Sequence, residues 1–364
     1  MSLETIIKSL TKVVCVILFG LALAGKADAA KYEITRLNIY EPMHDPNVYF
    51  SRAMCINEDG EIVGKYGVYP FYDGQKAFFY KNGSVRDLGE TVLWDIRPSI
   101  NDLGDIAVCS KSPNKSFVYK IGENPLDLAF WSENINNKGE VVGGVGNEIY
   151  LYSEGKTITL LHSGDGVEAK AINEHTQIVG NVYGIVGGHA FLWENGVVTH
   201  LSPKLGCRAT DINNSQIVGY FISGSQGYAC IWEKPEQNWV MTRLDTVPSS
   251  ANAINDNGQI VGSEMSLENP TKAVLYEIRN GEYIKINLND FLPENSEFER
   301  LVCALDINDK GQIVGYGYLT RNLHIPGEQA FLATPIPLQG DLNKDDIVNL
   351  DDLSVLAEHW LEER

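Results

Sequence analysis

The C-terminal end of the chain holds the side chains whose spacing best fits a definite chemistry. Past Gly340, oxygen-bearing side chains stand at positions 1, 3, 5, 9 and 12 of a twelve-residue segment, and Ile347 at position 7 offers its backbone carbonyl. These side chains belong to Asp341, Asn343, Asp345, Asn349 and Asp352. Calcium takes about six to eight oxygen ligands, and this spacing curls such oxygens around one point. The tail is therefore predicted to bind Ca²⁺; the alternative is a solvated acidic tail without a metal.

The segment after this loop is predicted to be a short amphipathic helix, because Leu353, Leu356 and Trp360 recur on one side of it. Loop and helix together resemble one half of a type I dockerin, a module that also carries Asp at position 12. The resemblance implies calcium-dependent attachment to a cohesin-like or cell-envelope partner. Two features depart from it. Asp346 stands where a glycine is usual, and the loop–helix unit occurs once, whereas dockerins pair two.

The long region ahead of the tail is organised by a repeated phrase. Ile-Asn, a short turn and then Ile-Val-Gly or a close variant recur seven times, with between 35 and 53 residues from one Asn to the next. Such a period indicates an array of supersecondary units that fold as one body. The copies begin at Ile56-Asn57, Ile100-Asn101, Ile135-Asn136, Ile172-Asn173, Ile212-Asn213, Ile254-Asn255 and Ile307-Asn308.

One copy shows what each unit is predicted to fold into. Ala169–Asn173, Gln177–Gly180, His189–Trp193 and Val197–Leu201 are short runs rich in Val, Ile, Phe and Trp, with Asn and Gly turns between them. Such runs predict strands, and none of them has helical periodicity. Four strands repeated seven times predict an all-β fold, a seven-bladed β-propeller.

The two ends of the array complement each other. Tyr32–Leu37 resembles Trp239–Leu244, the fourth strand of an internal unit, but has no three strands before it. The last unit ends at Ala330–Thr334 and lacks a fourth strand of its own. The N-terminal strand is therefore predicted to complete the last blade, which leaves no sheet edge open.

Two recurrent residue classes each allow a structural and a ligand-binding interpretation. In turns such as Asn255–Gly258, Asn can bond the backbone ahead of it and Gly tolerates positive φ, which favours a structural role. An aromatic residue usually ends third strands such as His189–Trp193, and sheet-on-sheet packing is favoured over a ring of ligand-stacking side chains.

The second copy of the repeat is irregular, with Arg97 where five of the seven copies carry Ala.

The repeat pattern resembles HAF repeats, named for a tripeptide that stands here as His189-Ala190-Phe191. The resemblance covers residues 32–334 in stronger and weaker copies. It implies a secreted bacterial or archaeal protein, often with a sorting or attachment tail. It supplies no catalytic residues.

Residues 1–29 are predicted to be a secretory signal peptide. Lys8 and Lys12 precede the apolar run Val13–Leu23, and Ala27–Ala29 offers a small-residue cleavage site. The alternative is a retained anchor, but the apolar run is short for a bilayer. The mature protein is thus expected to be secreted, to the extracellular space, cell surface or periplasm, without a membrane span. The expected organisation is then a propeller at 30–334, a linker at 335–340 and the calcium-binding tail at 341–364.

The net charge of the chain restricts the classes of partner it can bind. The formal net charge is −19, from 29 basic and 48 acidic residues, which argues against nucleic acid and anionic membranes as partners.

Five cysteines remain after cleavage, an odd number without CxxC spacing, so a disulfide framework or zinc site is not expected. Buried small hydrophobic residues are favoured over one bridge between neighbouring repeats. The five are Cys55, Cys109, Cys207, Cys230 and Cys303.

Three functions remain open from sequence. The first is a secreted, non-catalytic propeller that binds a protein or glycan ligand and is attached through its calcium tail. The second is a secreted polysaccharide hydrolase or lyase. Its acids would include Asp211 and Asp306, which precede Ile-Asn and either face the channel or satisfy backbone groups. The third is a structural cell-envelope component.

No catalytic residue is assigned, because the seven histidines are scattered without metal spacing. Four Gly- and Tyr-rich connections are expected to gather on one face, as a sugar-binding rim or as ordinary hairpin loops. They are Tyr66–Tyr72, Val182–Gly188, Phe221–Gly227 and Tyr316–His324.

Overall fold

The computed structural model describes residues 31–39, 48–68, 75–91, 97–110, 115–120, 122–164, 166–184, 188–202, 206–265, 270–320 and 327–336. The predicted signal peptide and the calcium loop at 341–352 lie outside these residues, so both stay predictions, as does the helix expected after the loop. Ile34–Ala333 forms one compact unit. The chain ends, Met1–Glu33 and Thr334–Arg364, group separately, and of them only residues 31–33 and 334–336 are described.

The described strands form seven sheets of four strands each. Sheet 1 holds β2 (Val48–Ile56), β3 (Ile62–Val68), β4 (Lys76–Lys81) and β5 (Ser84–Thr91). Sheet 2 holds β6 (Ser99–Ile100), β7 (Ile106–Ser110), β8 (Lys115–Tyr119) and β9 (Leu126–Leu128). Sheet 3 holds β10 (Trp131–Ile135), β11 (Val141–Val145), β12 (Glu148–Ser153) and β13 (Lys156–His162). Sheet 4 holds β14 (Val167–Ile172), β15 (Ile178–Val182), β16 (His189–Glu194) and β17 (Val197–His200).

The remaining sheets follow the same plan. Sheet 5 holds β18 (Cys207–Ile212), β19 (Ile217–Ser223), β20 (Gln226–Glu233) and β21 (Val240–Arg243). Sheet 6 holds β22 (Ser249–Ile254), β23 (Ile260–Glu264), β24 (Lys272–Arg279) and β25 (Glu282–Asn287), followed by the 3-10 helix η2 (Leu288–Phe291). Sheet 7 holds β26 (Phe298–Ile307), β27 (Ile313–Leu319) and β28 (Glu328–Ile336), and its fourth strand is β1 (Lys31–Arg36).

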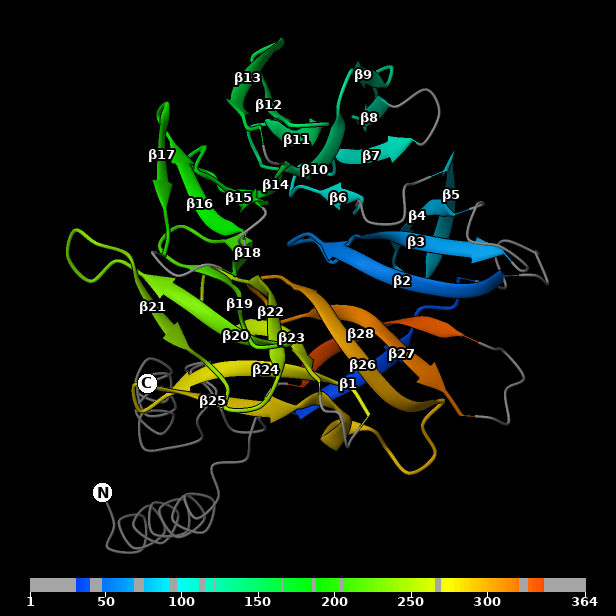
Figure 1. The fold of residues 1–364 in the computed structure, drawn as a ribbon. Coiled ribbons are helices and arrows are strands. Elements are labelled where there is room, and N and C mark those ends of the chain that lie inside the picture. The colour runs from blue at the N-terminus through cyan, green and yellow to red at the C-terminus, as the bar shows by residue number, and fades with distance from the viewer. Residues whose placement is uncertain are drawn as a thin grey trace, which may run out of the picture. The chain divides into compact units, whose positions relative to one another are not determined.

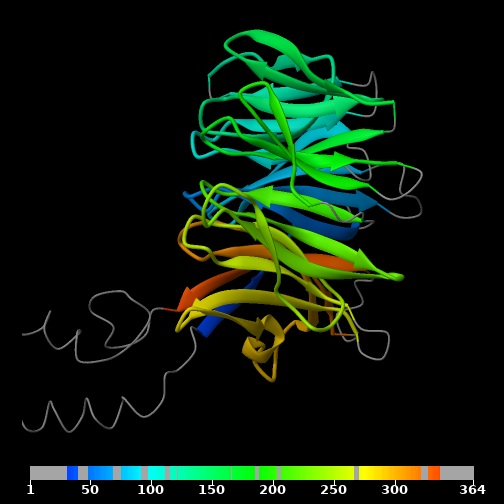
Figure 2. The same ribbon diagram turned by 60° about the vertical axis from the view of Figure 1, so that its left-hand side comes forward.

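The sheets of the unit Ile34–Ala333 stand around a common centre, with the first strand of each sheet innermost (Figure 1). Burial follows this arrangement: the inner strand β22 is almost wholly buried, whereas the outer strand β21 is mostly exposed. The connections between strands fall at two opposite faces of this unit (Figure 2). The prediction of an all-β, seven-bladed propeller is confirmed. In the described part of the chain, no helix has the length and hydropathy of a membrane span.

The predicted ring closure is also confirmed. In sheet 7 the strand order is β1-β28-β27-β26, so the N-terminal strand supplies the missing fourth strand. Just past β1, the Leu37 amide donates to the Ala330 carbonyl at 2.9 Å. Leu37 and Ile39 are fully buried in one apolar cluster with Ala53 and Phe78 of sheet 1. The start of the array therefore packs between its last sheet and its first.

The Ile-Val-Gly segment is explained by close packing around its glycine. A Cβ on Gly180 would lie 2.1 Å from the Glu168 carbonyl oxygen and 2.8 Å from the Phe191 ring. The third-strand aromatic residue thus covers a site that admits no side chain. In sheet 2, Val108 takes the glycine position, and there the first strand β6 is only two residues long.

The third-strand aromatic residues form core, as favoured from the sequence. Phe78, Phe191, Trp232, Tyr276 and Phe331 are at most 1% exposed. Four aromatic residues at or near the ends of third strands are partly buried and pack against apolar clusters of the core; they are Tyr80, Tyr119, Tyr152 and Trp193.

The asparagine of each Ile-Asn pair has a structural role on two levels, as Asn136 shows. Its Oδ1 accepts from the amides of Lys138 and Glu140, at 3.1 and 3.0 Å, which closes the local turn. Its Nδ2 donates to the Glu140 carboxylate at 2.8 Å and to the carbonyl of Asn173, in the next sheet, at 3.1 Å. Both acceptor and both donor positions of the amide are therefore used.

This inter-sheet hydrogen bond recurs around the whole ring, which we call the asparagine relay. Each Nδ2 donates to the backbone carbonyl of the next asparagine, at distances from 2.8 to 3.1 Å, and the last bond joins Asn308 to Asn57. The donors, in order, are Asn57, Asn101, Asn136, Asn173, Asn213, Asn255 and Asn308. The repeated residue is thus a turn former and a link between sheets.

All five cysteines of the described chain are free, and four of them are buried. Cys55 is partly exposed. Because none is bridged, these thiols act as small apolar side chains, as favoured from the sequence.

Candidate functional site

A cavity of about 740 Å³ lies along the centre of the propeller. Side chains on or beside the first strands of all seven sheets line it. Near one mouth it is also lined by the ends of second strands in sheets 4, 5 and 6, where Tyr183, Ile222 and Met265 stand. We call this space the central cavity.

β-Bulges bring side chains into the central cavity. In six of the seven sheets the first strand carries an irregularity three residues before the Asn, for example between Ala169 and Ala171. The extra residue opposes no partner of its own, so its side chain can be re-aimed. All six extra residues line the cavity; they are Met54, Glu133, Lys170, Thr210, Asn252 and Leu305.

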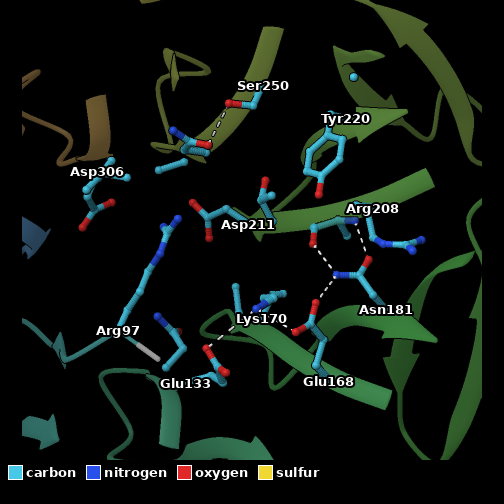
Figure 3. Close-up of a pocket in the computed structure, with 18 of the residues that line it drawn as sticks. Arg97, Glu133, Glu168, Lys170, Asn181, Arg208, Asp211, Tyr220, Ser250 and Asp306 are labelled. Carbon is cyan, nitrogen blue, oxygen red and sulfur yellow. Dashed lines mark hydrogen bonds and ion pairs between the residues drawn. The ribbon is translucent and has the colours of Figure 1, made fainter. Parts of the chain in front are cut away.

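A group of charged side chains from sheets 3 and 4 lies on one wall of the cavity (Figure 3). The Lys170 ammonium nitrogen lies 3.0 Å from a carboxylate oxygen of Glu168 and 4.0 Å from one of Glu133. Glu168 also accepts hydrogen bonds from the Asn181 amide, at 3.1 Å, and from the Tyr183 hydroxyl. Glu168 is thus held by three neighbours, whereas Glu133 has only the Lys170 ion pair among the described residues.

Burial raises the pKa of Glu133 to about 7, and the nearby Glu168 charge acts in the same direction. Lys170 and Arg97 oppose the rise but do not cancel it. A carboxyl with this pKa carries a proton about half the time at neutral pH, so Glu133 can either donate or accept a proton there.

Asp211 and Asp306 both line the cavity and satisfy backbone groups. Asp211 accepts from its neighbour Ile212 at 2.8 Å and from Ile254, in the next sheet, at 2.9 Å. Asp306 accepts in the same way from Ile307 and, across the ring closure, from Ile56, each at 2.9 Å. Both roles that the sequence left open for these aspartates, facing the channel and satisfying backbone groups, are therefore present in the structure. Burial and the charge of Asp306 raise the pKa of Asp211 to about 7 despite these bonds.

Arg97, to which the sequence assigned no role, also lines the cavity. Figure 3 shows its side chain reaching into the cavity toward Asp211 and Asp306. Burial raises the pKa values of both aspartates and of Glu133, and the charge of Arg97 partly opposes this rise. No hydrogen bond or ion pair engages its guanidinium within the described part of the chain. The signal was present in the sequence, because Arg97 replaces the alanine of five other copies.

The mouth of the cavity carries exposed apolar groups. Tyr183, Ile222 and Met265 stand within one residue of the ends of second strands in three neighbouring sheets and are 40%, 42% and 40% exposed. The guanidinium of Arg208 lies 4.8 Å from the centre of the Tyr183 ring. Of the four connections expected to form a rim, Val182–Gly188 and Phe221–Gly227 contribute described residues to the cavity. The described parts of Tyr66–Tyr72 and Tyr316–His324 do not line it.

The described residues hold no group of three or more His, Cys, Asp or Glu side chains arranged for a metal ion. The predicted calcium ligands, Asp341, Asn343, Asp345, Ile347, Asn349 and Asp352, lie outside the described residues.

Three solved structures illustrate the likeness of this fold to known propellers. The β-propeller domain of the Trilobed protease from Pyrococcus furiosus, which has an open velcro topology, matches with a TM-score of 0.54 and 14% identity, over 78% of this chain and 95% of that one. Virginiamycin B lyase from Staphylococcus aureus matches with a TM-score of 0.51 and 10% identity, over 85% and 100%. The acylaminoacyl peptidase of Pyrococcus horikoshii matches with a TM-score of 0.51 and 12% identity, over 74% of this chain and 50% of that one.

These likenesses show the fold: the chain is a β-propeller. At such low identity they assign no activity. No family model matches the chain, and no curated protein matches it in sequence. The resemblances to HAF repeats and to a dockerin therefore rest on the motifs alone.

Proposed function

We propose that this protein is a secreted, non-catalytic propeller that binds a protein or glycan ligand in the central cavity and is attached or assembled through a calcium-binding tail. The observation that carries the proposal is a roomy cavity whose acids are mostly engaged by the protein itself. Small-molecule sites occupy about 300–1,000 Å³, and the central cavity, at about 740 Å³, falls in that range.

The engagement of the acids favours binding over catalysis. Asp211 and Asp306 each accept two backbone hydrogen bonds, and Glu168 is held by a lysine, an amide and a hydroxyl. A carboxylate bound in this way is positioned rigidly, which suits recognition. It has less freedom to take a proton from a substrate.

The attachment part of the proposal rests on the sequence of the tail. Calorimetric titration of the full chain with Ca²⁺ tests it. One site is expected in the parent, and none in the double variant Asp341→Asn, Asp345→Asn. Equal heats from both proteins would remove calcium from the account.

A second candidate is a secreted polysaccharide hydrolase or lyase, and one observation favours it. Glu133 lines the cavity and has a pKa of about 7, and among the described residues it is held only by the Lys170 ion pair at 4.0 Å. These are properties of a general acid or base.

One comparison separates the two candidates. The calcium-loaded protein is incubated with a polysaccharide panel, and both retention and release of new reducing or unsaturated ends are measured. Binding without new ends, lost in Tyr183→Ala but kept in Val240→Ala on the outer strand β21, is the expected result. New ends formed by the parent and abolished in Glu133→Gln would replace the binding function by the enzymatic one.

A further inference from the structure

Side chains of both charge signs line the central cavity. They are Arg97 of sheet 2, Glu133 of sheet 3, Glu168 and Lys170 of sheet 4, Arg208 and Asp211 of sheet 5, and Asp306 of sheet 7. An anionic ligand at this level would meet the carboxylates, and a cationic one would meet the arginine and lysine. Like charges that come together in a partly desolvated site cost affinity. The wall therefore disfavours a net charge of either sign.

A hydroxyl group fits such a wall, because it donates one hydrogen bond and accepts others at the same atom. Arginine and lysine supply donors, and the carboxylates supply acceptors. The guanidinium of Arg97, on the sheet 2 wall, makes no hydrogen bond or ion pair within the described residues, so its N–H groups are available to a ligand hydroxyl.

The mouth adds a different surface. The ring of Tyr183 and the side chains of Ile222 and Met265 offer apolar area in the same cavity. A sugar ring has the matching two-sided character, with hydroxyls at its edge and C–H groups on its faces. Aromatic side chains pack well against such faces while polar groups bind the edge.

From these observations we infer that the central cavity takes the end of an uncharged glycan and discriminates against sugars that carry a carboxylate, a sulfate or a free amine. The inference rests on the proposed function, since it names the ligand class of the same site. It goes further by assigning the discrimination to named side chains: Glu133 and Asp211 against anions, and Arg97 and Lys170 against cations.

The test compares matched probes on the full-length mature chain. Hexose oligosaccharides are presented in neutral form, with a uronic acid in place of the terminal hexose, and with a free amino sugar there. At least one neutral oligosaccharide is expected to bind, and its two charged counterparts should bind at least tenfold more weakly. A charged form that binds as tightly as its neutral counterpart, or tighter, would overturn the inference.

Charge-removing variants give a readout that loss of structure would not produce. Glu133→Gln should improve the uronate-to-neutral affinity ratio by about tenfold, and Arg97→Gln should improve the amine-to-neutral ratio similarly. Glu236→Gln, an exposed change on the β20–β21 hairpin, should change neither ratio. A poorly folded variant would lower all affinities together and leave the ratios unchanged. Unchanged ratios in well-folded variants contradict the assignment.

Failure of the inference can be told apart from failure of the proposed function. Charged glycans that bind and are lost in Tyr183→Ala would keep the cavity as a binding site and overturn its neutrality. If a protein ligand binds in the cavity and no glycan does, the cavity remains a binding site and the inference of a glycan ligand is overturned. If no glycan or protein binds with sensitivity to Tyr183→Ala, both the inference and the proposed function fail.

Discussion

The asparagine relay makes a sharp prediction about Asn136. This side chain is 3% exposed and makes four hydrogen bonds, three with its own turn and one with the carbonyl of Asn173 in the next sheet. Replacing it by alanine leaves the Lys138 and Glu140 amides and the Asn173 carbonyl without these partners. An unsatisfied buried group costs about 1–3 kcal/mol. Water reaches some of these groups, because the turn lies at a face of the propeller. Asn136→Ala should therefore lower the free energy of unfolding by about 3–5 kcal/mol.

The assay is equilibrium unfolding in urea, with the free energy of unfolding compared among variants. Asn238→Ala is the matched control, since Asn238 is exposed on the β20–β21 hairpin, and it should stay within about 0.5 kcal/mol of the parent. Asn136→Asp keeps the acceptor oxygens of the turn but loses both donor bonds of the amide, to Glu140 and to Asn173, and places a second carboxylate beside Glu140. It therefore tests the donor side of the amide, including the link between sheets. It should also be destabilised. The reasoning is refuted if Asn136→Ala matches the control, and the inter-sheet link is refuted if Asn136→Asp matches the parent.

Three further predictions follow from burial, charge and closure. Since the folded pKa of Glu133 is raised from 4.5 to about 7, its contribution to stability is complete below pH 4.5 and lost as the pH rises through 7. Glu133→Gln should thus equal the parent in urea unfolding at pH 4 and exceed it at pH 8 by up to about 3 kcal/mol; equal stability at pH 8 would contradict this. Deletion of residues 31–37 exposes β28 as an open edge and should increase light scattering by aggregation, unlike the exposed change Glu33→Ala; an unchanged signal would argue against the closure. Of the five free cysteines only Cys55 is partly exposed, so at most one thiol of the native mature protein should react quickly with a thiol reagent; rapid reaction of several would contradict the buried assignment.

The sheets and the ring closure could be predicted because their signals are local in sequence. Each unit carries its own turn residues and its own strand runs, and the orphan strand Tyr32–Leu37 matches the gap left after Ala330–Thr334. The turn role of Asn136 follows from the same local chemistry. Its bond to Asn173 does not, because that contact exists only once two sheets are placed side by side.

The residues that line the cavity were harder to predict from the sequence than the sheets. A bulge changes which face a residue occupies, and alternation along the strand does not reveal it. Ala169, Lys170 and Ala171 look like an ordinary inner strand, yet the irregularity between the two alanines makes Lys170 the extra residue that lines the cavity. Arg97 stood out as an irregular copy, but its position among acids from other sheets needed the assembled ring.

The central claim is that the cavity binds a ligand with its mixed-charge wall and its apolar mouth. A crystal structure of the mature protein with a bound neutral oligosaccharide tests this most directly. The account expects an intact sugar whose hydroxyls contact Arg97 and whose ring lies against Tyr183. A sugar bound elsewhere on the propeller, or cleavage products beside Glu133, would contradict it.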